Sequence, residues 1–324
     1  MASSSPVLDC GLDEFTTHMV LSSLLFLLFV PATALNSVAA WVCLHLRSSS
    51  TFMVYLKNLV VADLLMTLTL PLSATALLPG CPVALRAFTC RVSDPVFYCC
   101  MYMSVILLGL ISLDRFFKVV RPRGRRPCQS LTLSKTISAS AWLFFITSNI
   151  LPTIVLTNQV PVNGSRDLCM KMKSPTGKAL HQKVVSINNA IFWCVSVLIG
   201  VCYVCIARKV FQSYKNSGSN NDEGNRRVKV RVFVVVMVFL LCFVPYHVLR
   251  ILYMKLRADK PSCLKTKLRF AKKFSVWLAM TNVCLDPLIY FFLCKPFRNK
   301  LREMIRIGDW TNSQSSTNND EATV

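Results

Sequence analysis

Seven long stretches of this chain contain neither lysine nor arginine and almost no acidic residue. They cover residues 19–44, 58–85, 95–113, 136–165, 184–207, 232–249 and 274–294, interrupted only by Asp63 and Asp286. A bilayer core about 30 Å thick needs about 20 apolar residues in a helix that rises about 1.5 Å per residue. The pattern therefore predicts an all-α membrane protein, folded as a bundle of seven transmembrane helices.

Composition excludes several other classes. Of the 324 residues, 53% are hydrophobic and 16% are charged, whereas ordinary soluble domains carry about 25% charged residues. The four histidines show no metal-binding spacing, and the chain has neither a phosphate-binding glycine loop nor a nucleophile elbow. We therefore expect neither an enzyme nor a resident cofactor. A transporter is a remote alternative, because one half of the chain does not repeat the other.

The first residues predict the orientation. Residues 1–18 contain three acids and no lysine or arginine, and they lack the basic start and cleavage site of a signal peptide. We expect residues 1–17 to be extracellular, residues 18–307 to form one multi-pass domain in the plasma membrane, and residues 308–324 to be a disordered cytoplasmic tail.

Basic residues are unusually frequent on the predicted outer face. That orientation places 21 of the 37 lysines and arginines inside and 16 outside, so the positive-inside rule favours it only weakly. The outer excess gathers at residues 166–183 and 250–273, and nine basic residues accompany Asp259 in the second cluster. A cationic mouth predicts an anionic extracellular ligand, although any single lysine there could be simply solvated. Because the net charge of +22 is divided between two faces of a membrane, we expect contact with membrane lipid and no nucleic-acid binding.

Five of the fifteen cysteines lie on the predicted outer face, where disulfides are stable. Cys90 could bond to Cys169, and Cys10 could reach Cys263, which leaves Cys81 over. The sequence alone does not fix this pairing. A glycosylation acceptor, Asn163 in Asn-Gly-Ser, lies in the same outer loop as Cys169.

Ionisable side chains within the spans mark candidate sites, because charge at membrane depth is costly. Asp63 and Asp286 would either share a proton or be bridged by a cation such as sodium, with further oxygens from Ser104 and Asn282. A hydrogen-bonded pair without a metal is the alternative.

A second candidate site lies in the sixth span. His247 and Arg250 are three residues apart and share a helix face. In a cleft open to water they would suit a phosphate group, since arginine matches phosphate oxygens with a planar fork. An arginine that reaches the lipid headgroups is the alternative.

Several strings occur in the order typical of one family. They are Asn36, Leu59–Asp63, Asp114-Arg115-Phe116 with Arg121-Pro122, Trp142, Cys242–His247, and Asp286–Tyr290 before a basic amphipathic segment at 295–307. Together they resemble the rhodopsin-like, class A G-protein-coupled receptors. The resemblance implies seven spans with a short amphipathic eighth helix, a G-protein partner, and a tail that receptor kinases phosphorylate for arrestin.

The sixth and seventh spans narrow the resemblance. Residues 244–250 and 284–294 are similar to those of purinergic nucleotide receptors, most of all to the subgroup that senses ADP or UDP-sugars and couples to Gi. This implies a cell-surface receptor for an anionic nucleotide. A class A receptor for a lysophospholipid or another anionic metabolite is the alternative, because the same cations would serve it.

The resemblance also implies roles for individual residues. Tyr98 would stack on the base, with Tyr102 one turn deeper. The remaining ligand contacts would be Lys173, His181, His247, Arg250, Tyr253 and Lys272. Val185 departs from the polar residue expected at its position.

Activation would begin when ligand phosphates draw the helix ends together and the sixth span pivots at Pro245. Phe243 stands in that span where most of the family has tryptophan. Arg115 would then leave Asp114 and form the G-protein docking site with two tyrosines, Tyr203 and Tyr290. Asn225 stands where many relatives have a restraining acid, with Asp222 and Glu223 just before it, so we expect measurable basal signalling.

Overall fold

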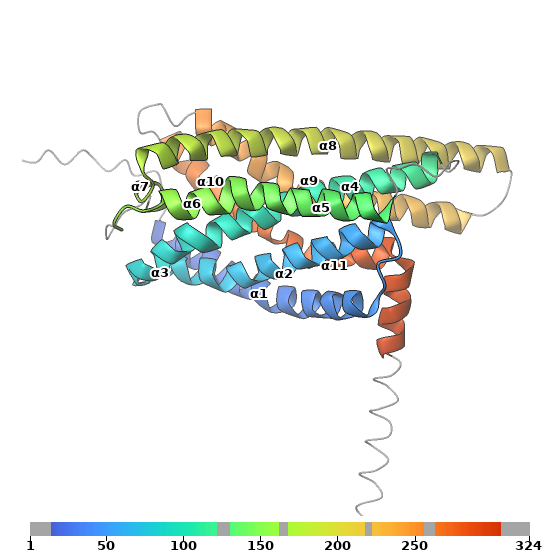
Figure 1. Ribbon diagram of the computed structural model, residues 1–324, viewed down its shortest axis with the longest axis horizontal. Coiled ribbons are helices and arrows are strands. Elements are labelled where there is room, and N and C mark those ends of the chain that lie inside the picture. Colours follow the sequence, from blue (N-terminus) through green and yellow to red (C-terminus); the bar gives the residue numbers. More distant parts are fainter. Residues whose placement is uncertain (1–13, 122–129, 162–167, 218–221, 256–262, 306–324) are drawn as a thin grey trace, which may run out of the picture.

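The computed structural model describes residues 14–121, 130–161, 168–217, 222–255 and 263–305, without the side chains of 213–233, 235, 265, 292 and 293. Within these ranges the secondary structure is helical and contains no strand. Seven helical units are long and apolar enough to cross a membrane, and they lie side by side along one direction (Figure 1). The predicted seven-helix bundle is confirmed.

Several spans are built from more than one helical segment. In chain order the spans are α1 (Glu14–His45); α2 (Thr51–Leu77); α3 (Val83–Phe88), η1 (Thr89–Ser93) and α4 (Asp94–Val120); α5 (Leu131–Phe145), η3 (Ile146–Ile150) and α6 (Leu151–Leu156); α8 (Pro175–Ser217); α9 (Asp222–Lys255); and α10 (Cys263–Met280) with α11 (Asn282–Leu293). The short α7 (Leu168–Lys171) precedes the fifth span. Residues 295–305 form a further helix that crosses one end of the bundle (Figure 1), in agreement with the predicted eighth helix.

The helices do not end where the uncharged stretches end. The second span stops at Leu77 rather than at residue 85, because the chain reverses at Gly80, whose φ of 77° favours glycine. The third span accordingly begins at Val83 and includes Arg86 and Arg91. Lack of charge therefore located the membrane-spanning part of each helix but not its full length.

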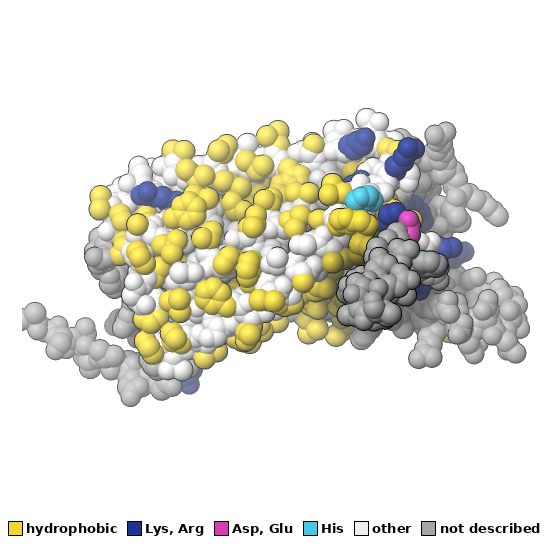
Figure 2. All heavy atoms as spheres, turned by 90° about the horizontal axis from the view of Figure 1, so that it is seen from below, with side chains coloured by type: hydrophobic (Ala, Val, Ile, Leu, Met, Phe, Trp, Pro, Cys, Tyr) yellow, Lys and Arg dark blue, Asp and Glu magenta, His cyan; other side chains and the backbone are white. Residues whose placement is uncertain are grey.

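The outward-facing side chains of the bundle are apolar. Leu27, Val30, Leu68, Val155 and Val197 are each 65% to 69% exposed. On the face shown in Figure 2 hydrophobic side chains cover most of the described surface, and charged side chains lie near the ends. Such a surface is unfavourable in water and suits contact with lipid.

One close helix contact depends on a glycine. A Cβ atom at Gly109 of α4 would lie 2.8 Å from Cγ1 of Val195 in α8. Because that distance is too short for two carbon atoms, only glycine lets α4 and α8 pack this closely. Both helices contribute residues to the cavity described below.

Candidate functional site

A cavity of about 230 Å³ lies at the end of the bundle where Cys90 and Cys169 form a disulfide. We call this the disulfide end. Six of the eight predicted ligand contacts line the cavity: Tyr98, Tyr102, Lys173, His181, Arg250 and Lys272. They come from α4, the segment before α8, α8 itself, α9 and α10. The bundle thus gathers cations and aromatic rings that are far apart in the sequence around one space.

Arg250 carries its charge among aromatic rings. One guanidinium nitrogen, Nη1, donates a hydrogen bond to the hydroxyl of Tyr246. The guanidinium carbon lies 5.5 Å from the ring centre of Tyr98 and 5.4 Å from that of Tyr246. No carboxylate of a described residue lies within 4.0 Å of this group. Ring contacts attract a cation but carry no net charge, so within the described part of the chain no acid compensates the positive charge of Arg250.

A second cavity of about 170 Å³ adjoins the first and shares His181, Arg250 and Lys272 with it. Tyr253, the seventh predicted ligand contact, lines this second cavity. The ammonium nitrogen of Lys272 lies 4.4 Å from the centre of the Tyr253 ring. Arg250 and Lys272 therefore stand at the boundary between two compartments, where each cation can reach a ligand in either.

Lys173 is almost enclosed and faces an acid. Its side chain is 7% exposed, and burial lowers the pKa of Lys173 whereas the charge of Asp94 opposes that shift. Asp94 lines the same cavity. Sequence reasoning counted Asp94 among the acids of the outer face but did not select it as a site residue, so the cavity wall carries an acid that the predicted ligand contacts did not include.

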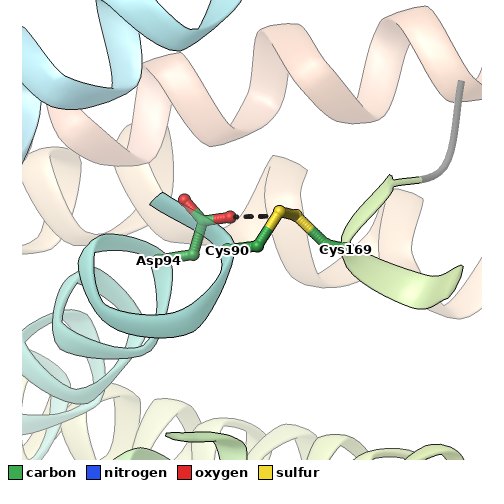
Figure 3. A group of neighbouring side chains, drawn as sticks. All are labelled: Cys90, Asp94 and Cys169. Atoms are coloured by element: carbon green, nitrogen blue, oxygen red, sulfur yellow. Dashed lines mark hydrogen bonds between the residues drawn. A yellow bond between two sulfur atoms is a disulfide. The ribbon is translucent and has the colours of Figure 1, made fainter. Parts of the chain in front are cut away.

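Figure 3 shows Asp94 beside the disulfide between η1 and α7. Oδ2 of Asp94 lies 3.8 Å from Sγ of Cys169, as the dashed line marks. A disulfide sulfur carries no proton to donate, so we regard this as a packing contact. The same three side chains are close enough together to suggest a metal site, but thiolates rather than disulfide sulfurs bind metals. The group therefore anchors the segment before α8 over the cavity.

Two amides complete the cavity wall, and sequence reasoning missed both. Nδ2 of Asn188 in α8 donates a hydrogen bond of 2.8 Å to Oδ1 of Asn149 in η3, and both side chains are buried. The π-helical turn η3 inserts an extra residue into the span, a feature that occurs frequently at functional sites. The available signal was an asparagine within each of two apolar spans, since a buried amide needs a partner.

His247 does not line either cavity. Its ring is fully buried, stacks on Phe192 with 3.5 Å between ring centres, and meets the ring of Tyr102 edge-on. Its Nδ1 lies 2.8 Å from the carbonyl oxygen of Phe243. His247 thus lies deeper than Arg250 on the same helix face, and its role as a ligand contact stays a prediction. His247 supports the floor of the cavity beneath Tyr102.

A second polar cluster lies in the interior of the bundle. Asp63, Asp286, Tyr290 and Asn282 are fully buried, and the two carboxylates are neighbours. The hydroxyl of Tyr290 donates a hydrogen bond to Asp63, and Nδ2 of Asn282 donates one of 2.7 Å to Asp286. One oxygen each of Asp63, Asp286, Asn282 and Ser104 is buried without a partner among the described residues. These oxygens provide the chemistry that binds a hard cation such as sodium.

The opposite end of the bundle carries the predicted G-protein site. Asp114 accepts hydrogen bonds of 2.5 Å from Thr51 and 2.7 Å from Lys118. The guanidinium carbon of Arg115 lies 4.0 Å from the ring centre of Phe52, and its Nε has no partner among the described residues. Arg115 makes no ion pair within 4.0 Å with an acid of the described residues and rests on the ring of Phe52. Its movement on activation stays a prediction.

Other predicted switch residues are inside the bundle. Phe243 and Tyr203 are buried, and the hydroxyl of Tyr203 has no partner among the described residues. Phe243 packs against Phe239 with 5.5 Å between ring centres.

Comparison with known proteins decides the family. Residues 35–290, from within the first span to the seventh, match the family described as "7 transmembrane receptor (rhodopsin family)". This chain belongs to that family. As a rhodopsin-family receptor it is a multi-pass membrane protein and not an enzyme, as the sequence predicted.

The receptor is also similar to individual curated proteins. It is 43% identical to purinoceptor 13 of Homo sapiens, over 90% of this chain and 83% of the relative. It is 36% identical to purinoceptor 14 of Bos taurus, over 95% and 92%. It is 37% identical to G-protein coupled receptor 87 of Mus musculus, over 89% and 80%. The resemblance to the purinergic branch of the rhodopsin family is confirmed.

The predicted disulfide bonds and the predicted glycosylation site have different outcomes in the structure. The disulfide between Cys90 and Cys169 is present, and Cys81 has a free thiol. Cys263 is disulfide-bonded, but its predicted partner Cys10 lies outside the described residues, as does the glycosylation acceptor Asn163.

The predicted basal-signalling segment is described only in part. Residues 222–225 are helical, but their side chains lie outside the description. Measurable basal signalling therefore stays a prediction.

Proposed function

We propose that this protein is a cell-surface receptor for an extracellular nucleotide of the ADP or UDP-sugar type and that it signals through Gi. One observation carries the proposal. Arg250, whose charge no acid in the described part of the chain compensates, lies between the ring of Tyr98 and a cavity that Lys272 also lines. Phosphate groups need such cations, and a nucleobase needs a flat ring to stack on. The names of the purinoceptor relatives support the same ligand class.

The proposed orientation places residues 1–17 and the disulfide end outside the cell. Disulfides persist in the oxidising exterior, and two cysteine pairs are expected there. The receptor then presents the cavity to extracellular ligands and the Arg115 end to the cytoplasm. Glycosylation at Asn163 belongs to the same proposal.

In the proposed mechanism, the phosphates of one ligand bind both Arg250 on α9 and Lys272 on α10. The phosphates compete with the hydroxyl of Tyr246 for the Arg250 guanidinium, and the charged partner is the stronger one. α9 then pivots at Pro245, a helix-interior proline that permits a kink. Binding shifts the equilibrium because the active state holds the phosphates more tightly.

At the cytoplasmic end, the pivot of α9 opens a cleft for the C-terminal helix of a Gα subunit. Arg115 leaves the ring of Phe52 and lines this cleft with Tyr203 and Tyr290. Receptor kinases and arrestin would act later, on the Ser- and Thr-rich tail at 308–324.

A sodium ion is proposed as a regulator of the same equilibrium. Asp63 and Asp286 would hold it, with Ser104 and Asn282 as further oxygen donors. The unpartnered oxygens of all four residues fit a hard cation. When bound, the ion would neutralise carboxylate charge and stabilise the resting arrangement of the spans around it.

A ligand panel tests the proposal. Cells that display the receptor are exposed to ADP, UDP-glucose and a lysophospholipid, and Gi activation is recorded against untransfected cells. Activation by a nucleotide at concentrations where the lysophospholipid is silent is the expected result. Activation by the lysophospholipid alone would reject the nucleotide and assign the cations to a lipid phosphate.

A further inference from the structure

An acid lines the cavity that is proposed to bind an anion. Asp94 begins α4 and lies four residues before Tyr98, so both side chains stand on the same face of the helix, one turn apart. Lys173 is the cation whose charge acts on Asp94, yet no ion pair within 4.0 Å joins Asp94 to a described residue. The only polar-atom contact of its carboxylate within the described part of the chain is with the disulfide sulfur of Cys169, which cannot donate a hydrogen bond.

A carboxylate in this place has a chemical consequence for the ligand. It repels phosphate, so the phosphates belong at Arg250 and Lys272, on α9 and α10. Near Asp94 the ligand must instead offer neutral hydrogen-bond donors, because an ionised carboxylate only accepts. Hydroxyl and amino groups of a nucleoside are such donors, and acidic side chains bind ribose hydroxyls in other nucleotide sites.

The neighbouring wall of the cavity agrees with this division. Asn149 and Asn188 are neutral and pair with each other, and Nδ2 of Asn149 also donates to the hydroxyl of Ser148 at 2.9 Å. The lining residues that α4, η3 and α8 contribute to this cavity, as far as the structure describes them, include no lysine or arginine, and Lys173 comes from the segment before α8. The cavity therefore has two sides: Arg250 and Lys272 suit the phosphates of the ligand, and Asp94 suits its neutral hydrogen-bond donors.

We propose that Asp94 is a specificity-determining residue that accepts a hydrogen bond from a hydroxyl or amino group of the nucleoside half of the ligand. This inference rests on the proposed nucleotide function. The competing role is purely positional, in which Asp94 acts through Lys173 and the ligand never touches it. A positional role affects every nucleotide equally, whereas a direct contact affects only ligands that carry the donor.

The experiment compares potencies of matched nucleotides on Asp94→Asn and Asp94→Ser, with Glu14→Gln as an acid-to-amide control at the same end of the bundle outside this cavity. ADP is compared with 2′,3′-dideoxy-ADP, which lacks the ribose hydroxyls, and with inosine diphosphate, which lacks the amino group. UDP is compared with 2′,3′-dideoxy-UDP. Gi activation is the readout, at surface expression matched by antibody binding.

In wild type the analogue that lacks the contacting group should be about 10- to 100-fold weaker than its parent, the value of one hydrogen bond to a charged group. Asp94→Asn and Asp94→Ser should weaken the parent and lower that ratio to about 2- to 10-fold, because each variant keeps a neutral acceptor in place of the charged one. If the ratio for the dideoxy analogue falls in the variants, Asp94 contacts a ribose hydroxyl. If the ratio for inosine diphosphate falls, Asp94 contacts the amino group.

Parent-to-analogue ratios that stay at their wild-type values in both variants, whatever happens to absolute potency, would overturn the inference and leave the proposed function standing. A wild-type receptor that ignores every nucleotide at normal surface expression would overturn both.

Discussion

The bundle buries charge of opposite sign in two places. Near the disulfide end, Arg250 lies among tyrosine rings with no acid within ion-pair distance among the described residues. Deeper in the bundle, Asp63 and Asp286 are neighbours, and their polar contacts are with Tyr290 and Asn282. Among the described residues, one region therefore holds a cation without an acidic partner, and the other holds two carboxyl groups without a basic partner.

Separation of the two regions explains how a receptor can keep buried charge unpaired. If Arg250 formed an ion pair with one of the two aspartates, both charges would be neutralised and neither group would need a bound ligand or ion. Held apart, each requires a mobile partner of opposite sign, an anionic ligand for Arg250 and a proton or sodium ion for the aspartates. Binding at each place then has a free energy that can shift the spans.

The largest loss of agonist potency should follow removal of Arg250, the cation near the disulfide end. Arg250→Ala should weaken a nucleotide agonist by about 2–5 kcal/mol, because the phosphates would lose a partner that is shielded from water. Tyr246→Phe, which keeps the ring but removes the hydroxyl bonded to Arg250, is the matched control and should not weaken the agonist. Equal potency of the agonist on wild type and Arg250→Ala would contradict the proposal that Arg250 binds the ligand's phosphates.

A smaller loss is expected at the boundary between the two cavities. Lys272→Ala should cost about 2 kcal/mol in agonist potency, since a lysine is a single point charge without the bidentate fork of arginine. The measurement is a dose–response curve for Gi activation. Lys267→Ala on the same helix, which lines neither cavity, provides the control. A larger loss for Lys267→Ala than for Lys272→Ala would contradict the assignment.

The negative region can be tested through sodium. In wild type, replacing sodium in the medium by a large organic cation should raise agonist potency about tenfold, within the usual range of coupling free energies. Asp63→Asn removes one charge at constant shape and should abolish that dependence. Persistence of the sodium effect in the variant would show that the ion acts elsewhere.

The smallest effect concerns Arg115, which rests on Phe52. Phe52→Leu removes a cation–π contact worth about 0.5–1 kcal/mol, and we expect it to raise ligand-independent Gi activation by about two- to fivefold. Phe116→Leu, adjacent to Arg115 in the sequence, serves as the control. Unchanged basal signalling in Phe52→Leu would mean that another contact restrains Arg115.

The sequence predicted these features unequally. Seven uncharged stretches were sufficient for the bundle, since membrane insertion depends on length and hydropathy that can be counted along the chain. Arg250 was predictable because basic residues are in excess on the outer face and it shares a helix face with His247. Lys272 could be selected from its basic neighbours only through the resemblance to purinergic receptors. The enclosure of His247 by the rings of Phe192 and Tyr102 was not predictable, because residues three apart share a helix face whether or not they reach the same cavity.

Partner choice was the least predictable part of the site. Asp114 had several possible partners. The packing of α2 against α4 brings Thr51 to one carboxylate oxygen, whereas Lys118, one turn further along α4, takes the other. Asn149 and Asn188 meet because a π-helical turn interrupts the fourth span. Such a turn depends on tertiary packing, and no residue type indicates it.

The decisive measurement is the potency series ADP, AMP and adenosine on the wild-type receptor, with UDP, UMP and uridine in parallel, read as Gi activation. Because phosphates are held to neutralise Arg250 and Lys272, potency should fall with each phosphate removed, and the nucleoside should be inactive at concentrations that saturate the diphosphate. A nucleoside as potent as its diphosphate would contradict the proposal that these cations bind the ligand's phosphates.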